Sequence, residues 1–217
     1  MEKFKSFTRK TDIDSIKSKF KQDVSPKNIT SEWRNIVVEF PPMNSSDEVK
    51  SEMMTIQRET ESRTTEDDEV IESHDLIATK SLRNYMDDNK LSWDVNDFAQ
   101  LTEISGLISR HFKNIFLRAR PYQLEKPLGI KINQSMYRDT DVGITPSYPA
   151  GHSTQSRLVA EYYAKKYPDH KKGLFAAAEK SGMSRIKAGW HYPSDHKAGV
   201  QLAKDILPLI RLPGEDS

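Results

Sequence analysis

The chain has 217 residues, a length that suits one domain and allows a buried core. Its 33 Lys and Arg residues nearly balance 32 Asp and Glu residues, so the net charge indicates neither a nucleic-acid partner nor a membrane surface. The lack of cysteine excludes disulfide bonds and thiol chemistry. The charged N-terminus has no apolar segment typical of a secretory signal, and no apolar run approaches the ~20 residues of a membrane span. We therefore expect a cytoplasmic protein without membrane spans.

The first 40 residues are polar and weakly patterned, and we assign them only as an N-terminal arm. A short helix is expected within this arm, around residues 13–20. Residues 41–217 are expected to form one domain, because apolar residues recur there at helical spacing and no segment alternates like a strand. The predicted fold class is therefore an all-α, single-domain helical bundle.

Two helical stretches are expected at the start of this domain. Ser45 and Glu48 have the spacing of a capping box, which closes the first turn of a helix. Three apolar residues then share one helical face, namely Val49, Met53 and Ile56. A second stretch is expected over about residues 66–86, and its acidic start suits the positive end of a helix dipole.

The longest helix is expected after residue 92. Its apolar residues recur at steps of three or four and form a core-facing stripe of about 20 residues. The stripe consists of Phe98, Leu101, Ile104, Ile108, Phe112 and Ile115. Residues 122–148 lack clear periodicity, so they predict a long loop, and such loops are often functional. Further helices are expected over about residues 151–166, 170–185 and 193–210.

The first of three basic motifs is Lys113, six intervening residues, then Arg120 and Pro121. Seven positions are about two helical turns, so Lys113 and Arg120 share a face if the helix continues that far. Taken alone, the pair is most simply interpreted as two solvated charges on a helix surface.

The second basic motif is Pro149-Ala150-Gly151-His152, directly before a predicted helix. A glycine at a helix start allows an anion to approach the backbone, and the unpaired N–H groups there can bind an oxyanion. A histidine beside such a site can transfer protons near neutral pH. Considered alone, the segment is more simply an ordinary glycine turn with a capping histidine.

The third basic motif runs from Ser184 and Arg185 to His191 and Asp195. Pro193 suits the first position of a new helix. His191 and Asp195 are four positions apart, near enough for the carboxylate to hold one ring nitrogen and raise the nucleophilicity of the other. A surface ion pair is the plain alternative for these two residues.

Together, the three motifs resemble a known signature. Lys-x6-Arg-Pro, Pro-Ser-Gly-His and Ser-Arg-x5-His-x3-Asp mark the superfamily that joins type 2 phosphatidic acid phosphatases, bacterial class A acid phosphatases and vanadium haloperoxidases. Here 27 residues separate the first two motifs and 31 separate the last two, similar to the family's spacing. Residues 41–53 also resemble the start of the soluble bacterial members. The resemblance covers about residues 40–210 and implies that family's helical bundle, with the site at one end of the core helices.

The resemblance implies a metal-independent acid phosphatase that hydrolyses phosphomonoesters through a phosphohistidine. His191 would attack phosphorus and Asp195 would orient it. His152 would protonate the leaving alcohol and then activate water. The phosphate oxygens would be bound by Lys113, Arg120, Arg185, Gly151 and Ser184. Three fixed cations can neutralise a phosphoryl group in transfer, so we expect neither a metal ion nor another cofactor.

Ala150 departs from the family's pattern, because the second motif usually carries serine at this position. The missing hydroxyl removes one hydrogen bond to the anion, worth about 1.5–3 kcal/mol. The backbone N–H remains, so we expect a weaker site rather than an inactive one. Ser147 and Ser153 are candidates to supply the hydroxyl instead.

Four residues near the motifs receive plainer predictions. Trp190 and Tyr192 flank His191 and are expected to pack around the site. Arg118 either adds positive field or is solvated. His196 is expected to be exposed, and the histidines as a set lack the spacing of metal ligands.

Two other functions stay open. A vanadium-dependent haloperoxidase would hold vanadate in the same pocket with His191 as a ligand, and halide oxidation by peroxide would identify it. A non-catalytic phosphate-binding or structural protein could keep the same fold and would hydrolyse no phosphoester. Because the chain lacks the membrane helices of lipid phosphatases, we expect small soluble phosphorylated substrates and no nucleic acid; a homodimer is left open.

Overall fold

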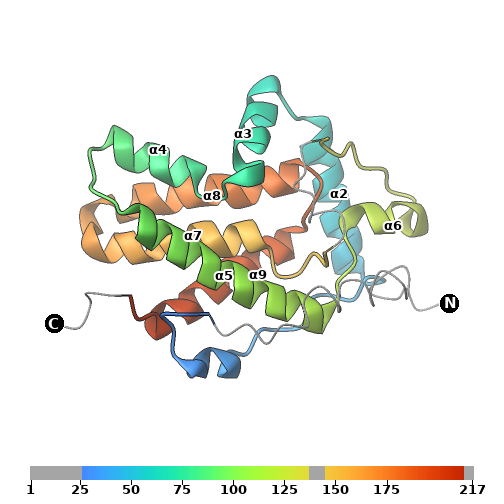
Figure 1. The fold of residues 1–217 in the computed structure, drawn as a ribbon. Coiled ribbons are helices and arrows are strands. Elements are labelled where there is room, and N and C mark those ends of the chain that lie inside the picture. The colour runs from blue at the N-terminus through green and yellow to red at the C-terminus, as the bar shows by residue number, and fades with distance from the viewer. Residues whose placement is uncertain (1–25, 137–144, 213–217) are drawn as a thin grey trace.

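The computed structural model describes residues 26–136 and 145–212 (Figure 1). Over these residues the chain forms helices and no β-strand, apart from an isolated antiparallel bridge between Ile29 and Ile210. The elements are η1 (Ser31–Asn35), α2 (Asp47–Glu61), α3 (Thr65–Leu76), α4 (Lys80–Asp88), α5 (Val95–Phe116), α6 (Pro121–Leu128), α7 (Gly151–Lys166), η2 (Pro168–His170), α8 (Lys171–Lys187), α9 (Pro193–Ile206) and η3 (Leu207–Leu209). The predicted all-α fold class is confirmed. The helix predicted around residues 13–20 lies outside the described residues.

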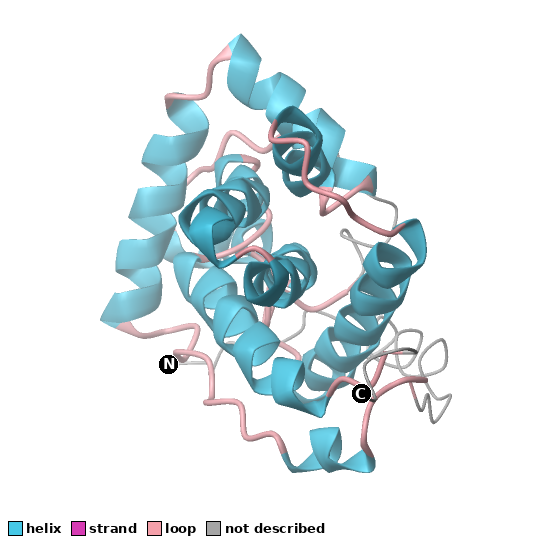
Figure 2. Ribbon diagram, turned by 90° about the vertical axis from the view of Figure 1, so that its left-hand side faces the viewer, coloured by secondary structure: helices cyan, strands magenta, loops and turns pink. Residues whose placement is uncertain are grey.

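Helix α7 packs against α5, α8 and α9 and forms the centre of the bundle. Helices α3 and α4 lie along α8, on the side away from α9 (Figure 1). Figure 2, turned by 90°, shows some helices of the bundle nearly end-on at the centre and others running across the view around them. The main core cluster includes Phe98 and Ile108 of α5, Leu158 of α7 and Leu202 of α9, and it leaves none of these more than 1% exposed. Burial of apolar side chains from three helices fixes their mutual arrangement.

Helix α5 follows the predicted stripe over most of its length. Asp94 caps its first turn by accepting hydrogen bonds from the backbone N–H groups of Asn96 and Asp97. Five of the six stripe residues are buried. Ile115 is the exception, with 55% of the residue exposed, although Phe112 and Phe116 of the same turn still belong to or pack against the main core cluster.

The end of α5 shows that the helix does not continue to Arg120, so the condition for Lys113 and Arg120 to share one helical face is not met. The helix ends at Phe116, where Leu117 adopts a left-handed backbone with a φ of 48°. Arg120 is then the N-cap of α6, with Pro121 at the first helical position. The two cations therefore come from two helices joined by a tight connection.

Three other boundaries differ from the predictions. The stretch over residues 66–86 is two helices, because the backbone leaves the helical region at Ile77 and α4 begins at Lys80. The expected loop 122–148 contains most of α6, which Gly129 ends at a positive φ of 68° and which is too short to show a periodic pattern. The cap of α2 is Ser46 rather than Ser45, since the Ser46 hydroxyl accepts from the Val49 backbone.

The described part of the predicted arm packs on the bundle. Trp33 of η1 is buried in the main core cluster, and its ring meets that of His111 edge-on at 5.1 Å. Among the helices of the described ranges, none is long and apolar enough to cross a membrane.

Candidate active site

The three basic motifs meet at one end of the bundle because the core helices alternate in direction. Lys113 lies in the last turn of α5, and Gly151 and His152 open α7. Arg185 lies in the last turn of α8, and Asp195 lies in the first turn of α9. Two helix N-termini therefore face two helix C-termini that carry cations, and the N-terminal N–H groups add positive potential there.

His191 and Asp195 form a buried hydrogen-bonded pair. The His191 Nδ1–H donates to Asp195 Oδ2 at 3.0 Å, since a carboxylate can only accept. This fixes the tautomer and leaves the Nε2 lone pair free of a proton. Arg120 points an Nη1–H at that lone pair from 3.0 Å. Burial and the Arg120 charge lower the pKa of His191 well below its usual value, against the opposing effect of Asp195, so the site favours the neutral form of the ring.

A second arginine, Arg118, forms an ion pair with the Asp195 carboxylate oxygen that His191 does not contact. Its guanidinium lies 2.6 Å from Asp195 Oδ1 and 3.0 Å from a carboxylate oxygen of Glu52 in α2. Glu52 also accepts from the backbone N–H and the hydroxyl of Ser194. Burial alone would raise the pKa of Asp195, but the Arg118 charge and the His191 hydrogen bond outweigh it and lower that pKa below its ordinary value. Asp195 therefore stays ionised and orients the ring.

The two cations of the first motif are held by main-chain carbonyls, from residues 145–147 and from Trp190. Lys113 Nζ donates to the carbonyls of Pro146 and Ser147 at 2.6 and 3.1 Å. Arg120 donates through Nε to the Thr145 carbonyl at 2.9 Å and through Nη1 to the Trp190 carbonyl at 2.8 Å. Main-chain carbonyls position both cations without cancelling their charge, which suits groups that must bind an anion.

His152 and Arg185 lie on the other side of the site. The His152 Nε2–H donates to the backbone carbonyl of His74 at 2.8 Å, and Arg185 forms an ion pair with Asp75 at 2.9 Å. Both partners come from the end of α3. Burial and the Arg185 charge lower the pKa of His152 to about 3, although backbone carbonyls oppose that shift. His152 is therefore neutral in the unliganded protein above that pH.

The cations of the site depress one another's pKa. After burial, the largest influence on Lys113 is Arg120, and the pKa of Lys113 lies well below its usual range. Burial also lowers the pKa of Arg120 to about 10, with Arg185 acting in the same direction against Asp195. Such mutual depression indicates an excess of positive charge in a buried place, and a bound anion relieves it.

The start of α7 leaves room for that anion. A Cβ atom placed on Gly151 would meet no atom within 4 Å, so packing does not require glycine at this position. The Ala150 side chain is 1% exposed, and its backbone N–H donates to the Asp195 carbonyl at 3.0 Å. Ser147 and Ser153, the candidates to replace the missing hydroxyl, have hydrogen-bond partners in Ala119 and His196 instead.

The remaining predicted residues have three different outcomes. Trp190 and Tyr192 are buried beside His191, as expected. The Ser184 hydroxyl donates to the Ser181 carbonyl within α8 at 2.8 Å, so its assignment to phosphate binding stays a prediction. The prediction for His196 is wrong, because its ring is held between Ser153 and Glu179 and its side chain is only 13% exposed.

Four residues of the site were missed as functional: Glu52, His74, Asp75 and Arg118. Each acts through a partner far away in sequence: Glu52 and Arg118 are 66 positions apart, and Asp75 and Arg185 are 110 positions apart. Arg118 offered one sequence signal, since it lies inside the first motif, but nothing local distinguished a buried partner of Asp195 from a solvated charge.

Comparison with known proteins matches the PAP2 superfamily to residues 98–207, which hold all three motifs and half of the chain. The chain belongs to the PAP2 superfamily. The "acid phosphatase" of Zymomonas mobilis is 32% identical over 127 residues, which cover 52% of this chain and 46% of that protein. The "lipid A 1-phosphatase" of Rhizobium etli is 31% identical over 99 residues, which cover 44% and 40%. The chain thus spans less than half the length of these PAP2 relatives.

Among solved structures, the fold is similar to a transmembrane PAP2 type phosphatidylglycerolphosphate phosphatase of Bacillus subtilis. The two share 20% sequence identity with a TM-score of 0.48, over 76% of this chain and 85% of that one.

Proposed function

We propose that the protein is a phosphatase that hydrolyses phosphomonoesters through a phosphohistidine at His191, without a metal ion. The observation that carries the proposal is a neutral histidine, fixed by a buried carboxylate, inside a group of mutually repelling cations. This arrangement combines a nucleophile with a dianion site. The PAP2 match and relatives called acid phosphatase and lipid A 1-phosphatase support the same reaction class.

In the first step, the Nε2 lone pair of His191 attacks phosphorus and forms a P–N bond while the P–O bond to the alcohol breaks. Lys113, Arg120 and Arg185 neutralise the charge on the other oxygens, and the Gly151 backbone N–H adds a donor. The leaving oxygen takes a proton from His152. Asp195 stabilises the positive charge that develops on the His191 ring.

In the second step, water attacks phosphorus and gives a proton to His152 while the P–N bond breaks. Inorganic phosphate leaves, and His191 recovers its lone pair. His152 is neutral in the free protein, so the proton for the first step arrives with the substrate. A phosphate monoanion that gives its proton to neutral His152 becomes a dianion beside a charged His152, which can then protonate the leaving oxygen. Because the second pKa of such phosphates is about 6, kcat/KM should fall above that pH.

The substrate is proposed to be a small soluble phosphomonoester. Each site cation binds phosphate oxygens whatever alcohol is attached, so a lipid phosphate remains a competing substrate that the assay must include. The names of the Rhizobium and Bacillus relatives make this comparison necessary.

The test is a phosphatase assay with EDTA present, on nitrophenyl phosphate, sugar phosphates and a short-chain lipid phosphate. We expect activity to survive EDTA, orthovanadate to inhibit competitively, and His191→Ala to lose more than about 10³-fold in kcat. Rapidly quenched wild type should carry an acid-labile phosphoryl group that His191→Ala lacks. Activity that is abolished by chelation and restored by a divalent ion would overturn the metal-independent mechanism. More than a tenth of wild-type kcat in His191→Ala would place the nucleophile elsewhere.

A further inference from the structure

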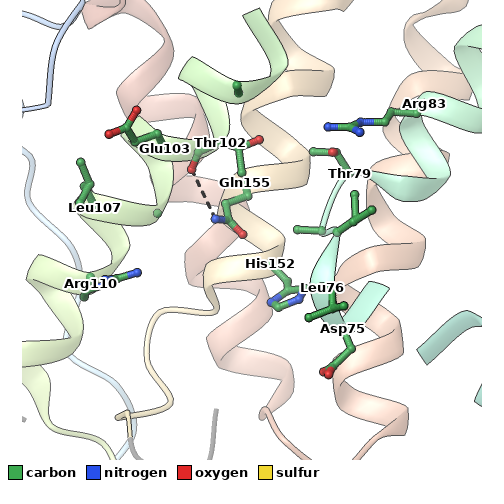
Figure 3. A pocket seen from close by; sticks show the side chains of 14 residues that line it. Asp75, Leu76, Thr79, Arg83, Thr102, Glu103, Leu107, Arg110, His152 and Gln155 are labelled. Carbon is green, nitrogen blue, oxygen red and sulfur yellow. Dashed lines mark hydrogen bonds between the residues drawn. The ribbon is translucent and has the colours of Figure 1, made fainter. Parts of the chain in front are cut away.

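A cavity of about 440 Å³ opens directly beside His152 (Figure 3). Its walls come from the end of α3, the connection to α4, and the facing sides of α4, α5 and α7. His152 and Asp75 are among its lining residues, and Asp75 is the ion-pair partner of Arg185. His191, Asp195 and Arg120 are not among the residues that line it. The cavity therefore lies on the His152 side of the site and not on the His191 side.

The geometry of phosphoryl transfer indicates which part of the substrate this cavity can hold. The attacking atom and the leaving oxygen lie roughly in line, on opposite sides of phosphorus. If His191 attacks and His152 protonates the leaving oxygen, the alcohol part of the substrate extends away from His191 and past His152. A volume of about 440 Å³ falls within the range of small-molecule sites and can hold a group the size of a sugar.

The charges on the wall indicate what kind of alcohol fits. Arg83 of α4 and Arg110 of α5 extend into the cavity from opposite sides (Figure 3). Of the two acids on the wall, Asp75 is engaged by Arg185 and the Glu103 carboxylate is directed away from the space between the arginines. Three uncharged polar residues, Thr79, Thr102 and Gln155, also line the cavity.

We propose, on the basis of the function proposed above, that this cavity binds the alcohol part of the substrate and prefers alcohols that carry a second negatively charged group, such as a second phosphate. Arg83 and Arg110 are the residues that recognise the second anion. Guanidinium groups suit this role because their planar fork pairs with phosphate or carboxylate oxygens in two parallel hydrogen bonds.

The walls also carry apolar side chains, among them Leu76, Ile77 and Leu107, so an acyl chain is the occupant to compare with an anionic group. Leu76 and Ile77 are 84% and 39% exposed. An acyl chain offers no hydrogen-bond acceptor to the two guanidinium groups, whereas an anionic group does. A lipid phosphate therefore serves as the contrasting substrate in the test.

The charge test compares fructose 1,6-bisphosphate with fructose 6-phosphate, by kcat/KM for phosphate release. Wild type should prefer the bisphosphate by about tenfold, the effect of one charge-assisted pair. Arg83→Gln and Arg110→Gln should each reduce that preference several-fold. Because Arg110 also affects Lys113, the ratio of the two substrates is the readout and not the rate on either. Lys80→Gln removes a charge from α4 outside the cavity and should leave the preference at its wild-type value.

A steric test locates the site independently of charge. Gly106 of α5 lines the cavity, and a Cβ atom there would lie 3.0 Å from the Gln155 side-chain nitrogen. Gly106→Leu fills the space, and replacing a helical glycine favours the helix itself. The variant should lose at least about tenfold more kcat/KM on the bisphosphate than on methyl phosphate, whose alcohol is too small to enter. Equal losses on both substrates would contradict this location.

Binding measurements separate this proposal from the proposed function. Calorimetric titration of His191→Ala with fructose 1,6-bisphosphate and with fructose 6-phosphate needs no turnover. Tighter binding of the bisphosphate, lost in Arg83→Gln and Arg110→Gln, supports the anion site even if no substrate is hydrolysed. No difference between the two sugars, or a preference for the lipid phosphate that the arginine variants leave unchanged, overturns it.

Discussion

The two histidines of the site lie at the same end of the bundle but are held very differently. His191 is fixed at both ring nitrogens, by Asp195 and by Arg120, and Asp195 is itself fixed by Arg118. Among the described residues, the His152 ring is bonded only to backbone groups at the end of α3, the His74 carbonyl among them, and it borders a cavity. The first side of the site is rigid and closed, whereas the second side faces a space in which a ligand can vary.

This difference matches what each side would do in phosphoryl transfer. A nucleophile needs one tautomer and one direction of attack, and several buried partners provide both. An acid that serves varied alcohols must gain and lose a proton and must tolerate leaving groups of different shape. The energetic consequence is that damage to the His191 side should affect every substrate, while damage to the His152 side should depend on the substrate.

The largest effect that tests this contrast comes from His152→Ala. An alkyl phosphate needs its leaving oxygen protonated, whereas nitrophenyl phosphate leaves as a weak base. General acid catalysis is worth about 10²–10⁴ in rate, so His152→Ala should lose that much more kcat/KM on a sugar phosphate than on nitrophenyl phosphate. His191→Ala should damage both substrates alike. Equal losses for His152→Ala would remove its acid role, and the reverse pattern would exchange the two assignments.

Substitution of Arg118 tests how strongly the His191 side of the site is held together. Arg118→Met leaves Asp195 and Glu52 buried without their counterion, which should lower the free energy of unfolding by about 3–5 kcal/mol. Denaturant titration measures this loss. Arg58→Met, on the exposed face of α2, should stay within about 0.5 kcal/mol of wild type.

A double variant tests whether Glu52 and Arg118 stabilise the protein as a pair. In a Glu52→Gln background one of the two stranded charges is already absent, so Arg118→Met should be less destabilising than in wild type. Equal losses in both backgrounds would mean that Glu52 and Arg118 do not act as a pair.

Low pH should reduce the free energy of unfolding, because His152 and His191 have lowered pKa values in the folded protein. The pKa of His152 is about 3 in the folded protein and about 6.5 when unfolded, so the unfolded state binds more protons below that upper value. Stability is therefore fully present above about pH 6.5 and falls as the pH drops, with the same sign for His191. Because His152 is partly open to the cavity, we expect its share to be about 1–2 kcal/mol between pH 7 and pH 4.

Unfolding by urea at pH 7, 5.5 and 4 measures how much His152 contributes to the pH dependence of stability. His152→Asn removes the titrating ring, so its stability should depend on pH less steeply than that of wild type. Parallel pH dependences for the two proteins would show that the cavity side does not hold His152 in its neutral form.

The smallest expected effect concerns Ala150, where the family usually has serine. Ser147 and Ser153 bond elsewhere, so their hydroxyls are committed, and Ala150→Ser should add a donor to the anion. Inhibition by vanadate should tighten by up to about tenfold, the value of a hydrogen bond near 1.4 kcal/mol. Ser153→Ala should leave that inhibition unchanged, since its hydroxyl bonds to His196. Unchanged inhibition in Ala150→Ser would indicate that another group already fills the position.

Local pattern was enough to predict most of the helices and the three basic motifs. The stripe that begins at Phe98, the glycine start of α7 and Pro193 at the start of α9 are each decided by neighbours within a turn or two, and helix formation depends mainly on such neighbours. Where a segment was too short to show a period, as in α6, or broke inside a continuous pattern, as at Ile77, the prediction failed.

The tertiary structure alone decided how the site residues are used. The ion pair of Arg118 with Asp195 joins residues 77 positions apart, and that of Arg185 with Asp75 joins residues 110 apart. The pKa of His152 depends on burial and on Arg185, neither of which is visible in the residues around it. Electrostatic interactions follow distance in space and exclusion of water, whereas helices follow distance along the chain; the sequence therefore determined which groups exist, and packing determined which of them are fixed and which face the cavity.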